Sequence, residues 1–164
     1  MPRRFAVRRL TLDRAAQAFP LIQSDFGDLT LEQWLGYVSH LLDVRNGGER
    51  GIACVESEQG YIHGLFVFRV LEDLRHGKTL GCEYLVAQDL IESGVVLSKL
   101  VDAMERLAAE CDCVAIHAFL PPDRKELLGA LEKAQHVVEM TGTCKRLIKS
   151  GQKQNSDYYT GALS

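Results

Sequence analysis

The sequence predicts a single α/β domain in which a mixed sheet of about seven strands is flanked by about four helices. Its 164 residues are a usual length for one domain with its own core, and its shares of apolar (46%) and charged (25%) residues are ordinary. Runs with strand character alternate with runs of helical spacing. A long helical segment that begins near residue 93 separates two apolar strands, as a parallel crossover requires.

Seven segments have the apolar, β-branched and aromatic character of strands. The expected strands are residues 5–12, 52–56, 61–71, 80–87, 113–120, 136–140 and 144–148. The polar loop 57–60 should turn the second and third of them into a hairpin.

The second helix carries the clearest local signal. Thr30 and Gln33 have capping-box spacing, and Leu29 and Trp34 have the spacing of a hydrophobic staple. We expect Trp34 in the core. The apolar stripe of this helix should consist of Leu31, Trp34, Leu35, Val38, Leu41 and Leu42.

The other three helices have weaker boundary signals. Asp13 is placed to cap the first helix, which should run towards residue 24 and bend or end at Pro20. Ser93 is a plausible cap for the long helix. Asp123 and Glu126 repeat the capping-box spacing before a short helix at 124–134.

Composition also excludes some classes of function. A net charge of −3 and a pI near 5.9 argue against a nucleic-acid partner, which needs a basic face. No apolar run reaches the roughly 18 to 20 residues of a membrane span. The arginines near the N-terminus precede no apolar signal-peptide core, so we expect a cytoplasmic protein.

The five cysteines are an odd number, and several lie in apolar runs, which fits a reducing compartment. Cys111 and Cys113 precede His117, but structural zinc sites usually separate their cysteines by two to four residues. We therefore expect no metal. Residues 150–164 are polar and lack periodicity, as in a flexible tail.

The order of these elements resembles the GNAT (GCN5-related) N-acetyltransferase superfamily over residues 5–148. The resemblance rests on Val7–Asp13 entering the first helix, on the Ile62–Val67 strand of the hairpin, and on Leu85–Ala87 ending a strand before the long helix. It implies one acyltransferase domain, residues 1–149, followed by the tail 150–164. A homodimer would pair through an exposed final hairpin, 137–148.

The resemblance implies acetyl-CoA, or another acyl-CoA, as co-substrate. The family holds its diphosphate with a loop of the form Gln/Arg-x-x-Gly-x-Gly/Ala at a helix N-terminus. Here Ser93, Gly94 and Val95 would bind it. Only Gly94 matches the pattern, because Ile91 and Val96 replace the first and last residues, and Ser93-Gly94 could instead only cap the helix.

The resemblance also implies a carboxylate base and a proton donor for attack of an amine on a thioester. Glu83 on the fourth strand is the candidate base, although it could instead pair with Arg69 or Lys78 across the sheet. Tyr84 is the candidate acid, since Leu131 stands at the family's tyrosine position. Other candidates that the sequence leaves open are Tyr158, Tyr159, His63, His117 and Cys82.

The backbone N–H groups of Leu85, Val86 and Ala87 would bind the thioester oxygen and the pantetheine arm, if the fourth and fifth strands separate there. Two hypotheses follow. The chain is an acyl-CoA-dependent N-acyltransferase acting on an amine of a small molecule or protein, or a catalytically degenerate module of the same fold that binds or assembles.

Overall fold

A five-stranded mixed sheet forms the centre of the computed structural model, which describes residues 4–47, 49–88 and 93–147. The strands follow one another across the sheet in chain order. All neighbours are antiparallel except β4 and β5, which are parallel and joined by a helix. The strands are β1 (Phe5–Arg9), β2 (Arg50–Ser57), β3 (Ile62–Asp73), β4 (Gly77–Ala87) and β5 (Ala115–Ala118).

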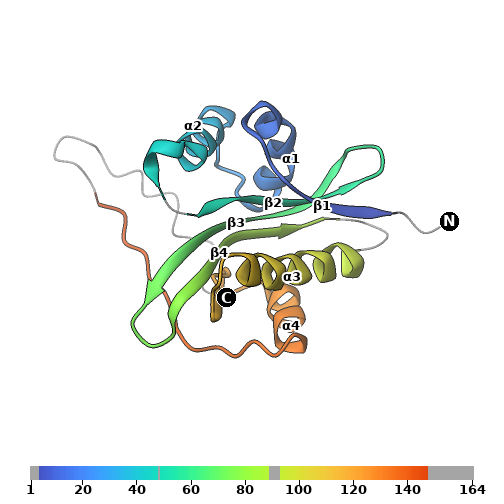
Figure 1. The fold of residues 1–164 in the computed structure, drawn as a ribbon. Helices are drawn as coiled ribbons and strands as arrows, with labels where there is room; N and C mark the ends of the chain where they lie inside the picture. The colour runs from blue at the N-terminus through green and yellow to red at the C-terminus, as the bar shows by residue number, and fades with distance from the viewer. Residues whose placement is uncertain (1–3, 48, 89–92, 148–164) are drawn as a thin grey trace, which may run out of the picture.

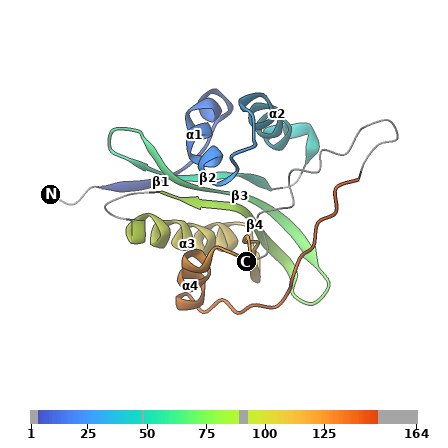
Figure 2. The ribbon, with the colours of Figure 1, turned by 180° about the vertical axis from the view of Figure 1, so that it is seen from behind.

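Helices cover both faces of the sheet. α1 and α2 lie on one face, and α3 and α4 lie on the other (Figures 1 and 2). The α-helices are α1 (Ala15–Asp25), α2 (Leu31–Leu42), α3 (Ser93–Glu110) and α4 (Lys125–Lys133), with 3₁₀ turns η1 (Leu12–Arg14) and η2 (Val44–Asn46). In the described part of the chain, every helix is too short or too polar to span a bilayer.

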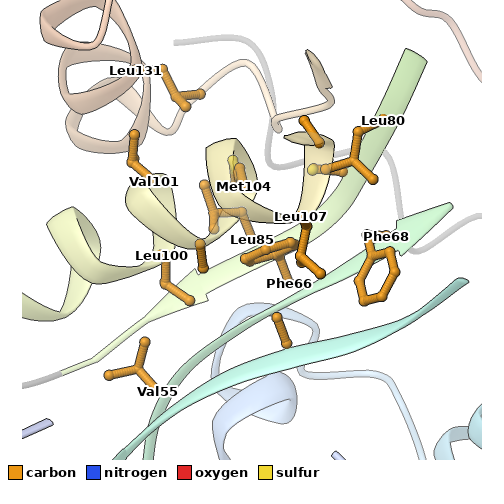
Figure 3. Packing of buried hydrophobic residues seen from close by; sticks show 14 of the residues in the cluster. Val55, Phe66, Phe68, Leu80, Leu85, Leu100, Val101, Met104, Leu107 and Leu131 are labelled. Atoms are coloured by element: carbon orange, nitrogen blue, oxygen red, sulfur yellow. The ribbon is translucent and has the colours of Figure 1, made fainter. Parts of the chain in front are cut away.

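The sheet separates two hydrophobic cores. Under α3 and α4, the rings of Phe66 and Phe68 pack with Leu100 and Met104 (Figure 3). Under α1 and α2, Trp34 is 2% exposed and its Nε1 donates a 2.7 Å hydrogen bond to the Ala15 carbonyl. The predicted core position of Trp34 is confirmed.

The start of α2 forms as predicted. The Gln33 N–H donates to the Thr30 hydroxyl, and the Thr30 N–H donates to the Gln33 side chain, so both halves of the capping box are present. Leu31 is 42% exposed, however, and does not belong to the buried stripe. It occupies the first helical position, where the chain is still turning onto the sheet.

Two predicted helix caps are wrong, and the first helix does not end at Pro20. Thr11, not Asp13, precedes η1, and the α-helix begins only at Ala15. α1 also continues through Pro20, which is exposed and removes a single N–H, while buried Leu21 and Ile22 hold the following turn on the sheet. α4 begins after Arg124 without a side-chain cap, so the predicted capping box at Asp123 is absent.

The last two predicted strands are also wrong within the described residues. Residues 136–147 form no strand, so the described sheet has five strands instead of about seven. Val137 and Met140 are 74% and 54% exposed, and an alternating pattern that buries no face has little reason to form a hairpin. The expected hairpin for a homodimer is therefore missing. Residue 148 and the tail 150–164 lie outside the described residues.

Candidate active site

A β-bulge interrupts β4 at Tyr84. Glu83 pairs with Val67 and Val86 pairs with Leu65, so two β4 residues face the single intervening β3 residue. Tyr84 takes up the extra length with φ at 52°, in the left-handed region that costs a non-glycine residue about 1–2 kcal/mol. The surrounding sheet must hold this conformation in place.

The bulge places Glu83 and Tyr84 on the face covered by α1 and α2. Val67, the cross-strand partner of Glu83, is buried in the core on that face, and cross-strand partners share a face. The Tyr84 ring contacts Phe26 and Tyr37 edge to face, at centroid distances of 5.5 and 5.8 Å. Tyr84 stays 41% exposed, so these aromatic rings flank a surface that a substrate can reach.

β4 and β5 separate next to this bulge. Their pairing runs from Thr79 to Cys82, and the Phe119 N–H donates to the Cys82 carbonyl at 2.8 Å. β4 continues to Ala87, where its only described neighbour is β3. The edge of β4 beyond Cys82 is therefore open in the described part of the chain.

The hydrogen bonding of Gln88 indicates which backbone groups face the open edge. Its N–H donates to the His63 carbonyl on β3 at 2.8 Å. Because backbone direction alternates along a strand, the N–H groups of Ala87 and Leu85 face away from β3, and that of Val86 faces it. The side chains of Leu85 and Val86 are buried, so what this segment offers at its edge is backbone.

A partly buried cation, Arg69, lies near Glu83. Arg69 Nη2 donates to the Tyr37 hydroxyl at 3.0 Å, while Arg69 Nε is buried without a hydrogen-bond partner among the described residues. Burial lowers the pKa of the Arg69 guanidinium. The hydrogen bond with the Tyr37 hydroxyl and the charge of the Glu83 carboxylate raise it by more, so the pKa lies above its ordinary value. Burial also raises the pKa of Tyr37, which stays a neutral phenol.

Glu83 is half-buried and makes no ion pair with Arg69 or Lys78, although all three residues are described. The cross-strand ion pair that the sequence offered as an alternative is therefore not formed. The Glu83 carboxylate is available for other chemistry, at a distance from which its charge still acts on Arg69 and Tyr37.

The N-terminal end of α3 lies along the same part of the sheet. Val95 is 44% exposed, and a Cβ on Gly94 would meet no atom within 4 Å, so this turn presents bare backbone. Val96 is fully buried and points into the core against Gly64. It therefore does not block the helix end. Asp89, Ile91, Glu92 and the Ser93 side chain lie outside the described residues.

The remaining sequence candidates are elsewhere or inert. Burial raises the pKa of the Cys82 thiol far above its ordinary value, so Cys82 is a core residue and no nucleophile. His63 packs against Phe5, and His117 packs against His76. Leu131 is 2% exposed in the core. Tyr158 and Tyr159 lie outside the described residues.

Two cavities, of about 290 and 250 Å³, border the β2–β3 turn, and Glu83, Tyr84 and Gly94 line neither. Sequence reasoning did not identify Phe26 or Tyr37 as site residues. It also did not identify that Arg69 lies beside Tyr37 on the face covered by α1 and α2. A single charge within the apolar run 65–71 was the available signal for Arg69. Nothing local marks the two rings, which only the bulge brings to Tyr84.

Many solved structures share this arrangement. A ribosomal-protein-alanine N-acetyltransferase from Brucella melitensis biovar Abortus 2308 superposes with a TM-score of 0.69 at 18% identity, over 88% of this chain and 100% of that one. An aminoglycoside N-acetyltransferase in complex with CoA gives 0.71 at 10% identity, over 91% and 97%. The chain has the GNAT fold.

Glucosamine-6-phosphate N-acetyltransferase from Arabidopsis thaliana superposes on this GNAT fold with a TM-score of 0.68 at 16% identity, over 88% of this chain and 99% of that one. No protein-family model matches the sequence. No curated protein matches it either. The predicted fold class is confirmed, while identities of 10–18% leave activity and substrate to be argued from the site.

Proposed function

We propose that this protein is an acyl-CoA-dependent N-acyltransferase that transfers an acetyl or other acyl group to an amine. The observation that carries the proposal is the edge of β4 that opens after Cys82, directly beside the half-buried carboxylate of Glu83. The fold supports it, since the similar structures include N-acetyltransferases, one of them in complex with CoA.

The residues present fit an acyl-CoA. Its pantetheine arm carries amides, which need backbone partners, and the N–H groups of Leu85 and Ala87 face the open edge. Its diphosphate needs N–H donors without obstruction, and Gly94 and Val95 in the first turn of α3, next to Ser93, supply such a surface. Val86 anchors this segment to β3.

Glu83 accepts the proton that the amine loses, because it is the carboxylate beside the open edge and makes no ion pair within the described residues. A bound acyl-CoA supplies the activated carbonyl. The N–H of Leu85 stabilises negative charge on that oxygen as the amine attacks. Tyr84, on the same face, holds its hydroxyl-bearing ring between Phe26 and Tyr37, where it can donate a proton to the leaving sulfur.

The acceptor amine enters on the α1 and α2 face. The aromatic wall there consists of Phe26, Tyr37 and Tyr84. Arg69 adds a positive charge through its guanidinium, which bonds the Tyr37 hydroxyl through Nη2. The similar structures act on, or are named for, acceptors as different as a ribosomal protein and aminoglycosides, so the proposal extends to an amine of a small molecule or protein.

The proposal is tested by calorimetric titration with acetyl-, propionyl- and succinyl-CoA. We expect saturable binding and a raised Tm, and weaker binding by Gly94→Val, whose side chain would project from bare backbone. Gly129→Val on α4, where a Cβ also meets no atom within 4 Å, is the matched control. Absence of both heat and thermal shift with every acyl-CoA would refute the proposal.

A further inference from the structure

Three potential metal ligands meet at the end of the β3–β4 hairpin. Asp73 is the last residue of β3, His76 lies in the turn, and His117 lies on β5. One ligand atom from each lies within 4.8 Å of the other two. All three residues are partly buried, which sets the group apart from a chance collection of surface charges.

A fourth potential ligand, Glu139, lies in the segment that follows α4. Glu139 Oε2 lies 2.9 Å from His76 Nε2 and accepts a 2.8 Å hydrogen bond from Arg75. Figures 1 and 2 both show this segment, orange to red, running beside the β3–β4 hairpin. Residues from three distant parts of the sequence therefore converge on one point.

The geometry of the group resembles a site prepared for a ligand. Asp73 Oδ1 accepts hydrogen bonds from the backbone N–H groups of Arg75 and His76, at 2.9 and 2.8 Å, which fix its carboxylate in the turn. His117 Nε2 is buried and has no hydrogen-bond partner among the described residues. A buried nitrogen without a partner is unfavourable, and it is rare in native structures unless a water or ion satisfies it.

We propose that His76, His117 and Asp73 bind a divalent transition-metal ion of the zinc class, with Glu139 as the fourth ligand. Two imidazoles and two carboxylates are a ligand set that such ions accept. Tetrahedral ligands about 2.0–2.1 Å from zinc lie about 3.3 Å apart, so the ligand atoms of Asp73, His76 and His117, now within 4.8 Å of one another, need to close by up to about 1.5 Å.

This site is separate from the acyltransferase function proposed above, because it contains none of the residues assigned there. It would tie the hairpin turn to β5 and to the segment after α4. The cysteine spacing near His117 led us to expect no metal. Asp73 and His76, which meet His117, lie more than 40 residues earlier in the chain. Arg75, now paired with Glu139, is 57% exposed and free to turn towards solvent.

The test uses untagged, full-length protein stripped with EDTA. Titration with Zn²⁺ should give one equivalent bound, and Co²⁺ as a probe should give the visible absorption of a low-coordinate nitrogen–oxygen site. His76→Gln and His117→Gln should each weaken Zn²⁺ binding at least about tenfold. His40→Gln on α2, an exposed histidine, should leave it unchanged. Equal affinity in the wild type and the His76→Gln/His117→Gln double variant would overturn the proposal.

A measurement on the wild type covers the case in which a variant fails to fold. Addition of Co²⁺ should broaden the imidazole NMR signals of His76 and His117 and spare that of His40, and Zn²⁺ should raise the Tm of the stripped protein. Unchanged signals from His76 and His117 would overturn the proposal, as would binding that tracks Cys111 and Cys113 instead.

Discussion

Gly64 of β3 lies directly under Val96 of α3. A Cβ at position 64 would come within 2.8 Å of Val96 Cγ1 and 2.9 Å of Leu100 Cδ1. Because Gly64 has no Cβ, α3 can pack closely against the sheet at this point, next to Ala87, the cross-strand partner of Gly64. This contact therefore sets the distance between the first turns of α3 and the open edge of β4.

Replacing Gly64 with Ala should destabilise the fold by about 1–3 kcal/mol, because the new methyl group overpacks a buried contact. Urea unfolding measures the change. Gly36→Ala is the matched control: position 36 lies inside α2 with no atom within 4 Å of a Cβ, so the same substitution should stabilise by about 1 kcal/mol. A neutral Gly64→Ala would show that α3 can shift freely.

Glu83→Gln should lower the rate of acyl transfer about 10²- to 10⁴-fold, because the amide cannot accept the proton from the amine. Affinity for acyl-CoA should change little, since the co-substrate is held by backbone groups. The readout is steady-state kinetics of CoA release with an accepted amine, alongside calorimetry. Glu58→Gln, in the exposed β2–β3 turn, is the control. Full activity in Glu83→Gln would favour a non-catalytic module or another base.

Tyr37→Phe should destabilise the protein by about 1.5–3 kcal/mol. The change removes the acceptor of the 3.0 Å hydrogen bond from Arg69, whose Nε already lacks a partner among the described residues, and leaves a partly buried charge less satisfied. Chemical unfolding at neutral pH measures it. Tyr61→Phe, at a side chain that is 67% exposed, should have almost no effect. Equal stabilities would mean that solvent reaches Arg69.

Stability should fall at alkaline pH in part through Cys54. Burial raises the pKa of its thiol from 9.0 to about 11, so between these values the unfolded chain loses the proton while the folded chain keeps it. The stability is present below pH 9 and is lost as pH rises towards 11, by up to about 2.7 kcal/mol for two pKa units.

The measurement compares urea unfolding at several pH values between 8 and 11. Cys54→Ala should flatten the dependence, while Cys144→Ala, at an exposed cysteine, should not. Since the alanine leaves a cavity at position 54, the slope with pH is the relevant quantity and not the stability at one pH. Equal slopes in the two variants would contradict the assignment.

Sequence reasoning succeeded where the signal was local. Thr30 and Gln33 form their capping box from residues three apart, and Trp34 lies in the core as the spacing of its helix predicts. It failed where tertiary contacts decided the outcome. Residues 137–147 have strand-like sequence, but whether they form strands depends on pairing with the sheet, and in the described structure they pair with no strand of it.

The candidate site divides in the same way. Glu83 and Gly94 could be selected by position along the expected elements, and both lie beside the open part of the sheet. Tyr84 could be selected as the candidate acid, but its left-handed conformation could not be predicted, because nothing in its side chain favours φ at 52°. The approach of His117 to Asp73 could not be found either, since it depends on the parallel register that sets His117 against Gly81.

The open edge of β4 has a consequence for solubility. A strand with unpaired N–H and C=O groups along one side is a template for another chain, and the edge here follows a buried apolar stretch, Leu85 to Val86. A ligand whose amides hydrogen-bond to that edge would pair its N–H and C=O groups, as a further strand would. Protein made without such a ligand should be the form that self-associates on storage, and occupancy of the edge should protect it.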